Sequence, residues 1–302
     1  MKRVSVVAGL AVVLAFVLGG VARAAVKKTT GQSRSEVVHF WTDSRMNAAV
    51  PVERAGKGAA NAGKPTATPY PFTALTPPQP YTTFPTNTNG KVYFTEGKTN
   101  YVCSGTALSS SNLSVVWTAG HCVNKGGGAF HTNWMFVPAY LNGQAPYGKF
   151  TARQLFSTPG WVNSGDFRYD VGAAAVATSS TTGTKLTSAL GGGRTLAAGG
   201  SVLNAPTQYV LYGYPAAKPF NGETLRGCQA PLGLLDPNSA APKPMGVGCN
   251  MTGGSSGGAW LNPSGQVISV NSFGYQTLKD VMFGPQQDAA ATDVYSAAAS
   301  LN

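Results

Sequence analysis

The sequence is poor in charged residues, in histidine and in long apolar runs. Only 11% of its 302 residues are Asp, Glu, Lys or Arg, and only three are His. Twelve of the 22 Lys and Arg residues precede residue 101, so the net charge of +11 belongs mostly to the N-terminal third. No basic helix and no stripe of basic and aromatic residues follows in the remainder. This composition argues against a nucleic-acid partner.

The long apolar run that does occur lies at the N-terminus. Residues 4–21 carry no charge and follow Lys2 and Arg3, and Ala22-Arg23-Ala24 fits a small-residue cleavage site. We interpret residues 1–24 as a secretory signal peptide. An uncleaved membrane anchor is the alternative, because a run of about 18 apolar residues nearly spans a bilayer. We expect a secreted, extracellular product that makes no membrane contact in its mature form.

Cysteine is scarce as well, with four residues: Cys103, Cys122, Cys228 and Cys249. An even number indicates two disulfides and an oxidising compartment. Three pairings are open, but each cysteine has one near neighbour, 19 residues away in the first pair and 21 in the second, so we expect these local pairs. No C-x-x-C or H-E-x-x-H spacing occurs, so the sequence predicts no metal site.

Residues 25–88 lack a hydrophobic period. A basic, polar start is followed by a short apolar island at 37–41 and then by a run rich in Ala, Gly, Pro and Thr. Such a composition cannot bury a core of its own. We predict a largely irregular pro-region and linker that is removed from the working protein.

From residue 89 onward, short runs of β-branched and aromatic residues alternate with turns. With 38 Gly and 20 Pro in the chain, this pattern favours an all-β fold. A glycine-rich stretch near residue 191 predicts a junction between two sets of strands, and Asp293 is expected to cap a short C-terminal helix ending at Ala299. The expected strands are 91–95, 101–108, 113–118, 134–137, 149–156, 169–177, 208–214, 224–228, 247–251, 259–261 and 267–271.

Two polar residues lie at the ends of predicted buried strands. His121 follows one such strand, whereas His39 falls in the predicted pro-region and His131 in a loop. Asp170 begins an apolar strand and is favoured over the nearby Asp166. An isolated ionised carboxylate is costly in an apolar setting, so Asp170 needs a partner, and an imidazolium would serve.

Two serines lie between glycine pairs in the run Gly253-Gly254-Ser255-Ser256-Gly257-Gly258. Glycine permits backbone angles that other residues avoid, so the N–H groups of Gly254 and Ser256 can converge on one oxyanion. We interpret Ser256 as a nucleophile; a flexible Gly-Ser turn is the alternative. Ser255 lies one residue before the nucleophile position of this motif, so its side chain should face away from the site.

The candidate residues follow the chain order His121, Asp170, Ser256. An esterase nucleophile elbow also fits G-x-S-x-G, but it requires a later histidine and none follows Ser256. The subtilisin order requires an Asp before the His, and the Asp available is Asp43, within the predicted pro-region. The order His, Asp, Ser is that of the chymotrypsin class.

Three blocks carry a resemblance: Thr118-Ala119-Gly120-His121-Cys122, Asp170 at the start of its apolar strand, and Gly254-Ser255-Ser256-Gly257-Gly258. Through them, residues 89–302 resemble the trypsin-like serine proteases, in particular the secreted bacterial branch that includes the glutamyl endopeptidases. The resemblance implies two antiparallel six-stranded β-barrels, about 89–190 and 191–302, with the site in the cleft between them. It also implies the site residues: a catalytic triad of His121, Asp170 and Ser256, an oxyanion hole formed by Gly254 and Ser256, and a Cys103–Cys122 disulfide that clamps the His121 loop.

The expected function is that of a serine endopeptidase. It would cleave peptide bonds of a protein or peptide substrate through an acyl-enzyme, without a cofactor, and act as a monomer made from a precursor. The alternative is a catalytically silent trypsin-like fold that acts as an extracellular binding module.

Two features depart from better-known relatives. Animal zymogens of this class are activated when a new N-terminal ammonium pairs with an Asp before the nucleophile, and Ser255 stands there instead. The resemblance also places substrate-binding residues at Asn250, Met251, Thr252, Asn271, Ser272, Phe273 and Gly274. Asn250 takes the place of the trypsin Asp, which argues against a Lys or Arg preference. The absence of a His near Asn271 argues against a Glu preference.

Overall fold

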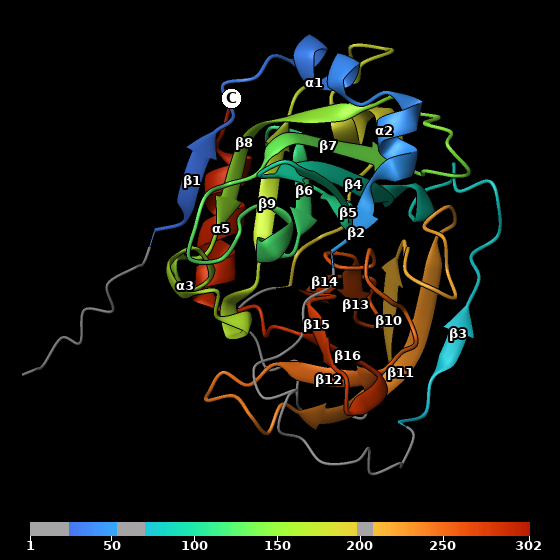
Figure 1. Cartoon of the computed structure of the whole chain (residues 1–302), viewed down its shortest axis with the longest axis vertical. Coiled ribbons are helices and arrows are strands. Elements are labelled where there is room, and N and C mark those ends of the chain that lie inside the picture. Colours follow the sequence, from blue (N-terminus) through green and yellow to red (C-terminus); the bar gives the residue numbers. More distant parts are fainter. Residues whose placement is uncertain (1–23, 53–69, 198–207) are drawn as a thin grey trace, which may run out of the picture.

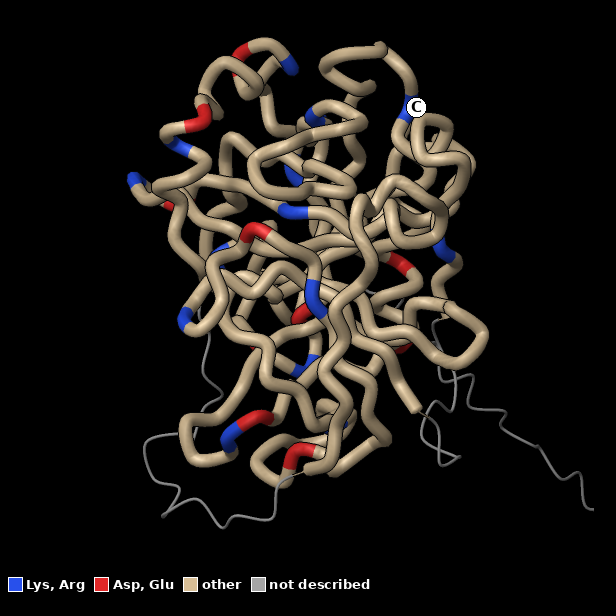
Figure 2. The backbone as a smooth tube through the Cα atoms, turned by 90° about the vertical axis from the view of Figure 1, so that its right-hand side faces the viewer, with Lys and Arg blue, Asp and Glu red and all other residues tan. Residues whose placement is uncertain are grey.

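The computed structural model describes residues 24–52, 70–197 and 208–302, which form two β-barrel units stacked one above the other (Figure 1). Apart from residue 24, the predicted signal peptide lies outside the described residues. No described segment forms a helix long and apolar enough to cross a bilayer. In the view of Figure 2, basic and acidic positions are scattered among uncharged ones.

The first sheet closes into a six-stranded antiparallel barrel. Its strands pair in the order β8-β7-β4-β5-β6-β9, and β9 returns to pair with β8. Buried β-branched and aromatic side chains fill its interior, including Val92, Trp117 and Phe136. The strands are β4 (Asn89–Glu96), β5 (Thr99–Leu108), β6 (Val115–Thr118), β7 (Thr132–Pro138), β8 (Phe150–Ser157) and β9 (Gly172–Val176).

The second sheet curls into a half-barrel around its own core. The described strands pair in the order β14-β13-β10-β11-β12-β16-β15. Leu211, Trp260 and Ile268 lie in this core beside a disulfide, Cys228–Cys249. The strands are β10 (Gln208–Gly213), β11 (Arg226–Leu235), β12 (Met245–Gly248), β13 (Ala259–Leu261), β14 (Val267–Val270), β15 (Phe273–Tyr275) and β16 (Leu278–Gly284). The expected all-β fold with two barrels is confirmed.

Helices are short except for one at the C-terminus. That helix, α5 (Ala289–Ala299), follows the second barrel but packs against the first through Ala291, Val294 and Ala298. Its N-cap is Asp288, which accepts the N–H groups of Ala290 and Ala291, so the predicted cap at Asp293 is wrong. The other helices from residue 86 onward are α3 (Pro159–Ser164), α4 (Leu186–Leu190) and the 3-10 turns η1 (Thr86–Thr88), η2 (Gly120–Cys122) and η3 (Phe167–Tyr169).

The predicted pro-region is more ordered than expected. Its described parts form β1 (Val26–Thr29), α1 (Arg34–Phe40), α2 (Asp43–Ala48), β2 (Val50–Pro51) and β3 (Thr73–Leu75). Trp41 is buried beside Tyr93, with ring centroids 5.3 Å apart, and its Nε1 donates to Asn133 O at 2.6 Å. The expectation of an irregular segment is therefore wrong for these residues. They build no core of their own: β1, β2, α1 and α2 pack on the first barrel, and β3 pairs with β11 of the second.

An ion pair between buried Lys91 and half-buried Glu223 joins the two barrels. Lys91 Nζ of β4 lies 3.4 Å from Glu223 Oε1, and Tyr140 Oη donates to the same carboxylate at 2.8 Å. Lys91 also lies over the Tyr140 ring, 4.5 Å from its centroid. Burial lowers the pKa of Lys91, and the neighbouring Glu223 opposes that shift.

Candidate active site

His121 is held at the end of a barrel strand by bonds on both sides of its backbone. It lies in η2, just after β6, and is fully buried. Its backbone N–H donates to Asp170 Oδ1 at 2.7 Å, and its carbonyl lies 3.0 Å from Nε2 of His131. The His131 ring in turn stacks on Phe94 at 4.3 Å. The imidazole of His121 is therefore carried on a rigid piece of backbone.

Asp170 is the acceptor around which this part of the site is ordered. It is fully buried between η3 and β9, and Oδ2 lies 2.7 Å from His121 Nδ1. The hydroxyl of Ser272, from the second barrel, also donates to Oδ2, at 2.5 Å. Three donors thus surround one carboxylate, which is the compensation that a buried charge requires.

The bond from Nδ1 leaves the other nitrogen of His121 as the functional one. A carboxylate can only accept, so Nδ1 carries the proton and Nε2 is the basic atom of a neutral ring. Among the described residues, the buried Nε2 atom has no hydrogen-bond partner. The imidazole is therefore oriented to receive a proton.

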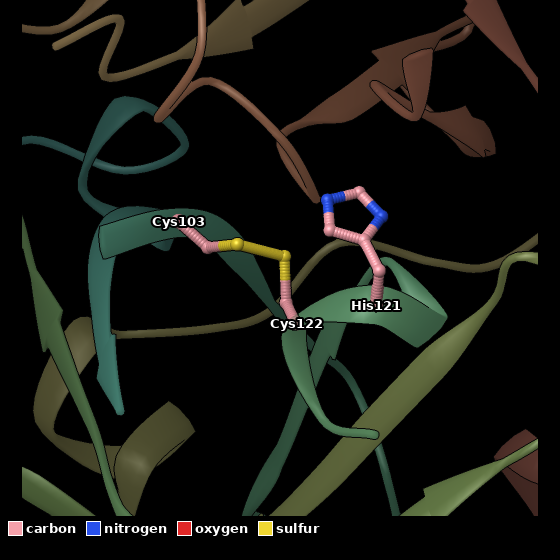
Figure 3. A group of neighbouring side chains, drawn as sticks. All are labelled: Cys103, His121 and Cys122. Carbon is pink, nitrogen blue, oxygen red and sulfur yellow. A yellow bond between two sulfur atoms is a disulfide. The ribbon is translucent and has the colours of Figure 1, made fainter. Parts of the chain in front are cut away.

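A disulfide anchors this ring to β5. Cys103 of β5 and Cys122 of η2 are joined, as the local-pair expectation proposed, and the second disulfide also pairs its near neighbours. Figure 3 shows the His121 ring beside the disulfide, and one of its nitrogens lies within 4.8 Å of the two sulfur atoms. Although Cys103, His121 and Cys122 lie close enough together to suggest metal ligands, the two sulfurs are bonded to each other and offer no thiolate.

The loop at Ser256 has the conformation that its glycines permit. Gly254 and Gly257 have φ angles of +94° and +82°, a region that L side chains rarely adopt. Ser256 is nearly buried, and its carbonyl accepts the N–H of Ser104 at 2.7 Å. Because Ser104 follows Cys103 directly, one strand ties the Ser256 loop to the disulfide beside His121.

The N–H groups of this loop fall into two groups. Those of Ser255, Gly257 and Gly258 donate to backbone carbonyls. Those of Gly254 and Ser256 have no acceptor among the described residues. Alternate N–H groups therefore remain available to an incoming oxyanion, which is the arrangement that an acyl-transfer site needs.

The two serines differ in their hydrogen bonding. Ser255 is buried, and its hydroxyl donates to Thr252 O at 2.8 Å. Ser256 Oγ has no hydrogen-bond partner among the described residues, and in particular no bond to His121 Nε2. Catalytic hydrogen bonds are often long in a free enzyme and shorten when substrate binds. Ser256 is thus the hydroxyl left free in this loop.

A family model described as Trypsin matches residues 78–284. The chain belongs to the trypsin family. Membership of this family indicates a peptidase that acts on proteins or peptides, and it accounts for the two-barrel fold.

Solved structures agree with this trypsin-family assignment. The protease Anisep from Arthrobacter nicotinovorans is 42% identical, with a TM-score of 0.66, over 71% of this chain and 96% of its own. The thermostable serine protease AL20, from an extremophilic microorganism, is 38% identical, with a TM-score of 0.66, over 72% and 98%. A Glu endopeptidase, 20% identical with a TM-score of 0.59, covers 76% of this chain and 97% of its own and shares the fold.

One curated relative gives a partial match. The extracellular metalloprotease of Bacillus subtilis (strain 168) is 33% identical over 73 residues, which are 24% of this chain. The match spans only 22% of that relative's length.

The trypsin-family chain has a cavity of about 580 Å³ at Ser256. Met251, Thr252, Ser272, Phe273 and Gly274, all predicted as substrate-binding, line it. Its other lining residues are Val52, Gly253, Ser255, Ser256, Tyr275, Gln276, Val281 and Met282. None of these lining residues carries a carboxylate, amine, guanidinium or imidazole group, so the cavity wall is uncharged.

Two predicted substrate-binding residues lie elsewhere. Neither Asn250 nor Asn271 lines the cavity. Asn271 is fully buried, and its Nδ2 donates to Tyr212 O at 2.9 Å and to Ser255 O at 3.0 Å. Its Oδ1 accepts Trp260 Nε1 at 2.8 Å. Asn271 therefore holds the Ser256 loop against the second barrel.

Three residues have roles at the site that the sequence analysis did not predict. Ser272 was assigned to substrate binding, but its hydroxyl bonds Asp170. His131 was discounted as a loop residue, yet it bonds the His121 backbone. Val52 was placed in an irregular pro-region, yet it lines the cavity. No local pattern marks any of them: Ser272 and Val52 contact segments distant in sequence, and the short run around His131 indicates only a loop.

Proposed function

We propose that the protein is a secreted serine endopeptidase that works through a triad of His121, Asp170 and Ser256. The observation that carries the proposal is the buried His121–Asp170 pair, whose basic Nε2 has no partner, in a site that also contains an unbonded Ser256 hydroxyl. A merely structural histidine is ordinarily bonded through both ring nitrogens when buried. The unsatisfied atom is therefore consistent with a group kept for proton transfer.

In the proposed reaction, Ser256 Oγ attacks the carbonyl carbon of the scissile peptide and gives its proton to His121 Nε2. Asp170, already bonded to Nδ1, stabilises the imidazolium. The imidazolium then protonates the departing amine, leaving an acyl ester on Ser256. Water repeats the sequence: His121 takes its proton, and the tetrahedral intermediate collapses to release the acid and restore Ser256.

The oxyanion of each tetrahedral intermediate would be held by the N–H groups of Gly254 and Ser256. Their lack of acceptors among the described residues supports this assignment. Donors already placed for the developing charge contribute about 3 kcal/mol each in comparable sites.

The cavity favours an uncharged side chain on the acyl side of the scissile bond. Met251, Val281 and Phe273 supply apolar surface, and no ionised group is present to pair with Lys, Arg or Glu. We propose that Met251, Thr252, Phe273 and Gly274 contact this side chain.

The proposal is tested at the two neighbouring serines. Ser256→Ala should abolish both peptide cleavage and labelling by a sulfonyl fluoride, whereas Ser255→Ala should keep both. Labelling is read from the mass of the modified peptide. A wild-type chain that is folded but never labelled would instead support the binding-module alternative, and loss of labelling only in Ser255→Ala would exchange the two roles.

Secretion, a precursor form and monomeric action complete the proposal. The apolar leader and the two disulfides support secretion, and the N-terminal segment that precedes the family match at residue 78 supports a precursor form. Sequencing the N-terminus of the product released into the medium tests the first two. A released form that starts at residue 25 would contradict removal of a pro-region.

A further inference from the structure

The first described segment, residues 24–52, reaches the candidate active site at Val52. β2 pairs in parallel with β5, Val50 opposite Tyr101 and Pro51 opposite Val102. The next residue, Val52, donates its N–H to Val102 O at 3.3 Å. In Figure 1, β2 runs from the first barrel toward the second at their boundary.

The side chain of Val52 lies beside the groups that would do the chemistry. It is only 3% exposed, it belongs to the apolar cluster that contains Cys103 and Cys122, and it lines the same cavity as Ser256. Val50, two residues earlier, is 44% exposed. The strand therefore presents one side chain to the solvent and inserts the other into the site.

Val50 and Pro51 lie along β5 on the leaving-group side of the cleft, and Val52 reaches the wall of the Ser256 cavity. The acyl part of a substrate stays with Ser256 and the cavity wall, whereas the amine departs beside His121, which protonates it. β5 is on the His121 side because its Cys103 is bonded to Cys122. The β5 edge that β2 covers is thus where the departing half of a substrate would add as a strand.

The direction of the segment matters as much as its position. On this edge, a substrate chain would lead away from Ser256 after its scissile bond. The segment from Val50 to Val52 leads toward the site instead, since it runs parallel to β5 from Tyr101 toward Cys103. It fills the cleft with reversed polarity, so its peptide bonds are not presented for cleavage.

The segment is firmly attached at its other end. β1 pairs with β8 over four residues, and a capping box between Ser33 and Glu36 starts α1. Val37, Trp41 and Met46 are buried against the first barrel. These contacts keep Val52 at a high effective concentration over the site, so that a weak local contact can compete with substrate.

We propose that Val50–Val52 form an autoinhibitory strand, which occupies the leaving-group side of the cleft in the full chain and excludes substrate until it is displaced. The inference rests on the proposed peptidase function. It identifies the β5 edge at Tyr101 and Val102 as a peptide-binding surface, and this chain's own segment as its first occupant.

The test uses the full chain with Val52→Asp, and Val50→Asp as the matched control. Each adds one carboxylate to the same short strand, but only at Val52 must the charge enter an apolar site. The substrate is a quenched peptide that extends three residues beyond the scissile bond, and intact mass verifies that the chain is uncut during the initial rate. Sulfonyl fluoride labelling of Ser256 measures the fraction of competent sites.

Val52→Asp should raise kcat/KM by about tenfold or more, because the competent fraction of sites rises when the strand is expelled. Val50→Asp should stay within about twofold of wild type. Val52→Ala, which retains a small apolar side chain, provides a milder second variant and should raise the rate by a smaller factor.

The outcomes separate the inference from the function on which it rests. If all variants are labelled at Ser256 and both Val52 variants cleave at the wild-type rate, the inference is wrong and the function stands. An equal gain in Val50→Asp also overturns it, since the effect would then not depend on the buried position. If no variant is labelled or cleaves, both fail.

Discussion

Replacing Asp170 with Asn tests the proton-transfer geometry most directly. The substitution keeps the volume of the side chain but makes its two terminal atoms unlike. The atom facing the backbone N–H of His121, 2.7 Å away, must accept, so the amide oxygen takes the place of Oδ1. The amide NH₂ then replaces Oδ2, which lies 2.7 Å from His121 Nδ1.

This orientation reverses the hydrogen bond to the ring. An NH₂ group donates to Nδ1, so the proton of the neutral imidazole moves to Nε2 and that nitrogen can no longer accept from Ser256. Loss of the correct tautomer reduces kcat by about 10⁴-fold in a triad of this kind, equivalent to about 5 kcal/mol of activation free energy. KM should change little, because Asp170 does not line the cavity.

The assay is steady-state hydrolysis of a peptide substrate near neutral pH, with near-ultraviolet circular dichroism to verify folding. Ser272→Ala serves as the control: it removes one donor to Asp170 but keeps the carboxylate and the tautomer. The loss of kcat in this control should remain below about 200-fold, because a hydrogen bond to a charged group contributes about 1.5–3 kcal/mol. A folded Asp170→Asn protein that retains more than a tenth of the activity would refute the argument.

Three further predictions concern stability. Replacing Cys103 and Cys122 with Ala should lower the free energy of unfolding by about 3 kcal/mol in a urea titration and also reduce kcat. Removing the second disulfide should lower the free energy of unfolding by a similar amount but reduce kcat less. Trp41→Ala should destabilise the full chain by about 3–5 kcal/mol, and an unchanged midpoint would show that the segment is not part of the fold. Burial lowers the pKa of Lys91 in the folded chain, so between that pKa and 10.5 the unfolded chain binds more protons. The free energy of unfolding of the wild type should therefore rise with pH over this range relative to that of Lys91→Met. Parallel pH profiles of the two proteins would contradict this.

Most strands of the two barrels and the loop at Ser256 were readable from local sequence, whereas β15 and β16 were not predicted. β-branched and aromatic runs between glycine and proline turns predicted β4, β5, β6 and β13 within a few residues. The glycines around Ser256 predicted a backbone that other residues avoid, and Gly254 and Gly257 adopt it. Such signals are local because propensities and positive φ angles belong to single residues and their neighbours.

The N-terminal segment shows why local signals fail elsewhere. Its run around Trp41 is too short to suggest a core, and the helices there form because the first barrel supplies the other half of the apolar contact. The wrong cap at Asp293 has the same origin. Ala289–Ala299 is stabilised by packing on β8 and β9, so the helix begins at Ala289 and its cap, Asp288, lies five residues before Asp293.

By itself, the sequence determined the order His121, Asp170, Ser256, the two local cysteine pairs and the all-β class, because these depend on residue identity and spacing along the chain. Only the tertiary structure decided that Ser272 bonds Asp170 and that Val52 lies at the Ser256 cavity. Both facts join segments more than 100 residues apart. Contacts at that separation are selected by the closure of the barrels and the packing between them, which no window of sequence contains.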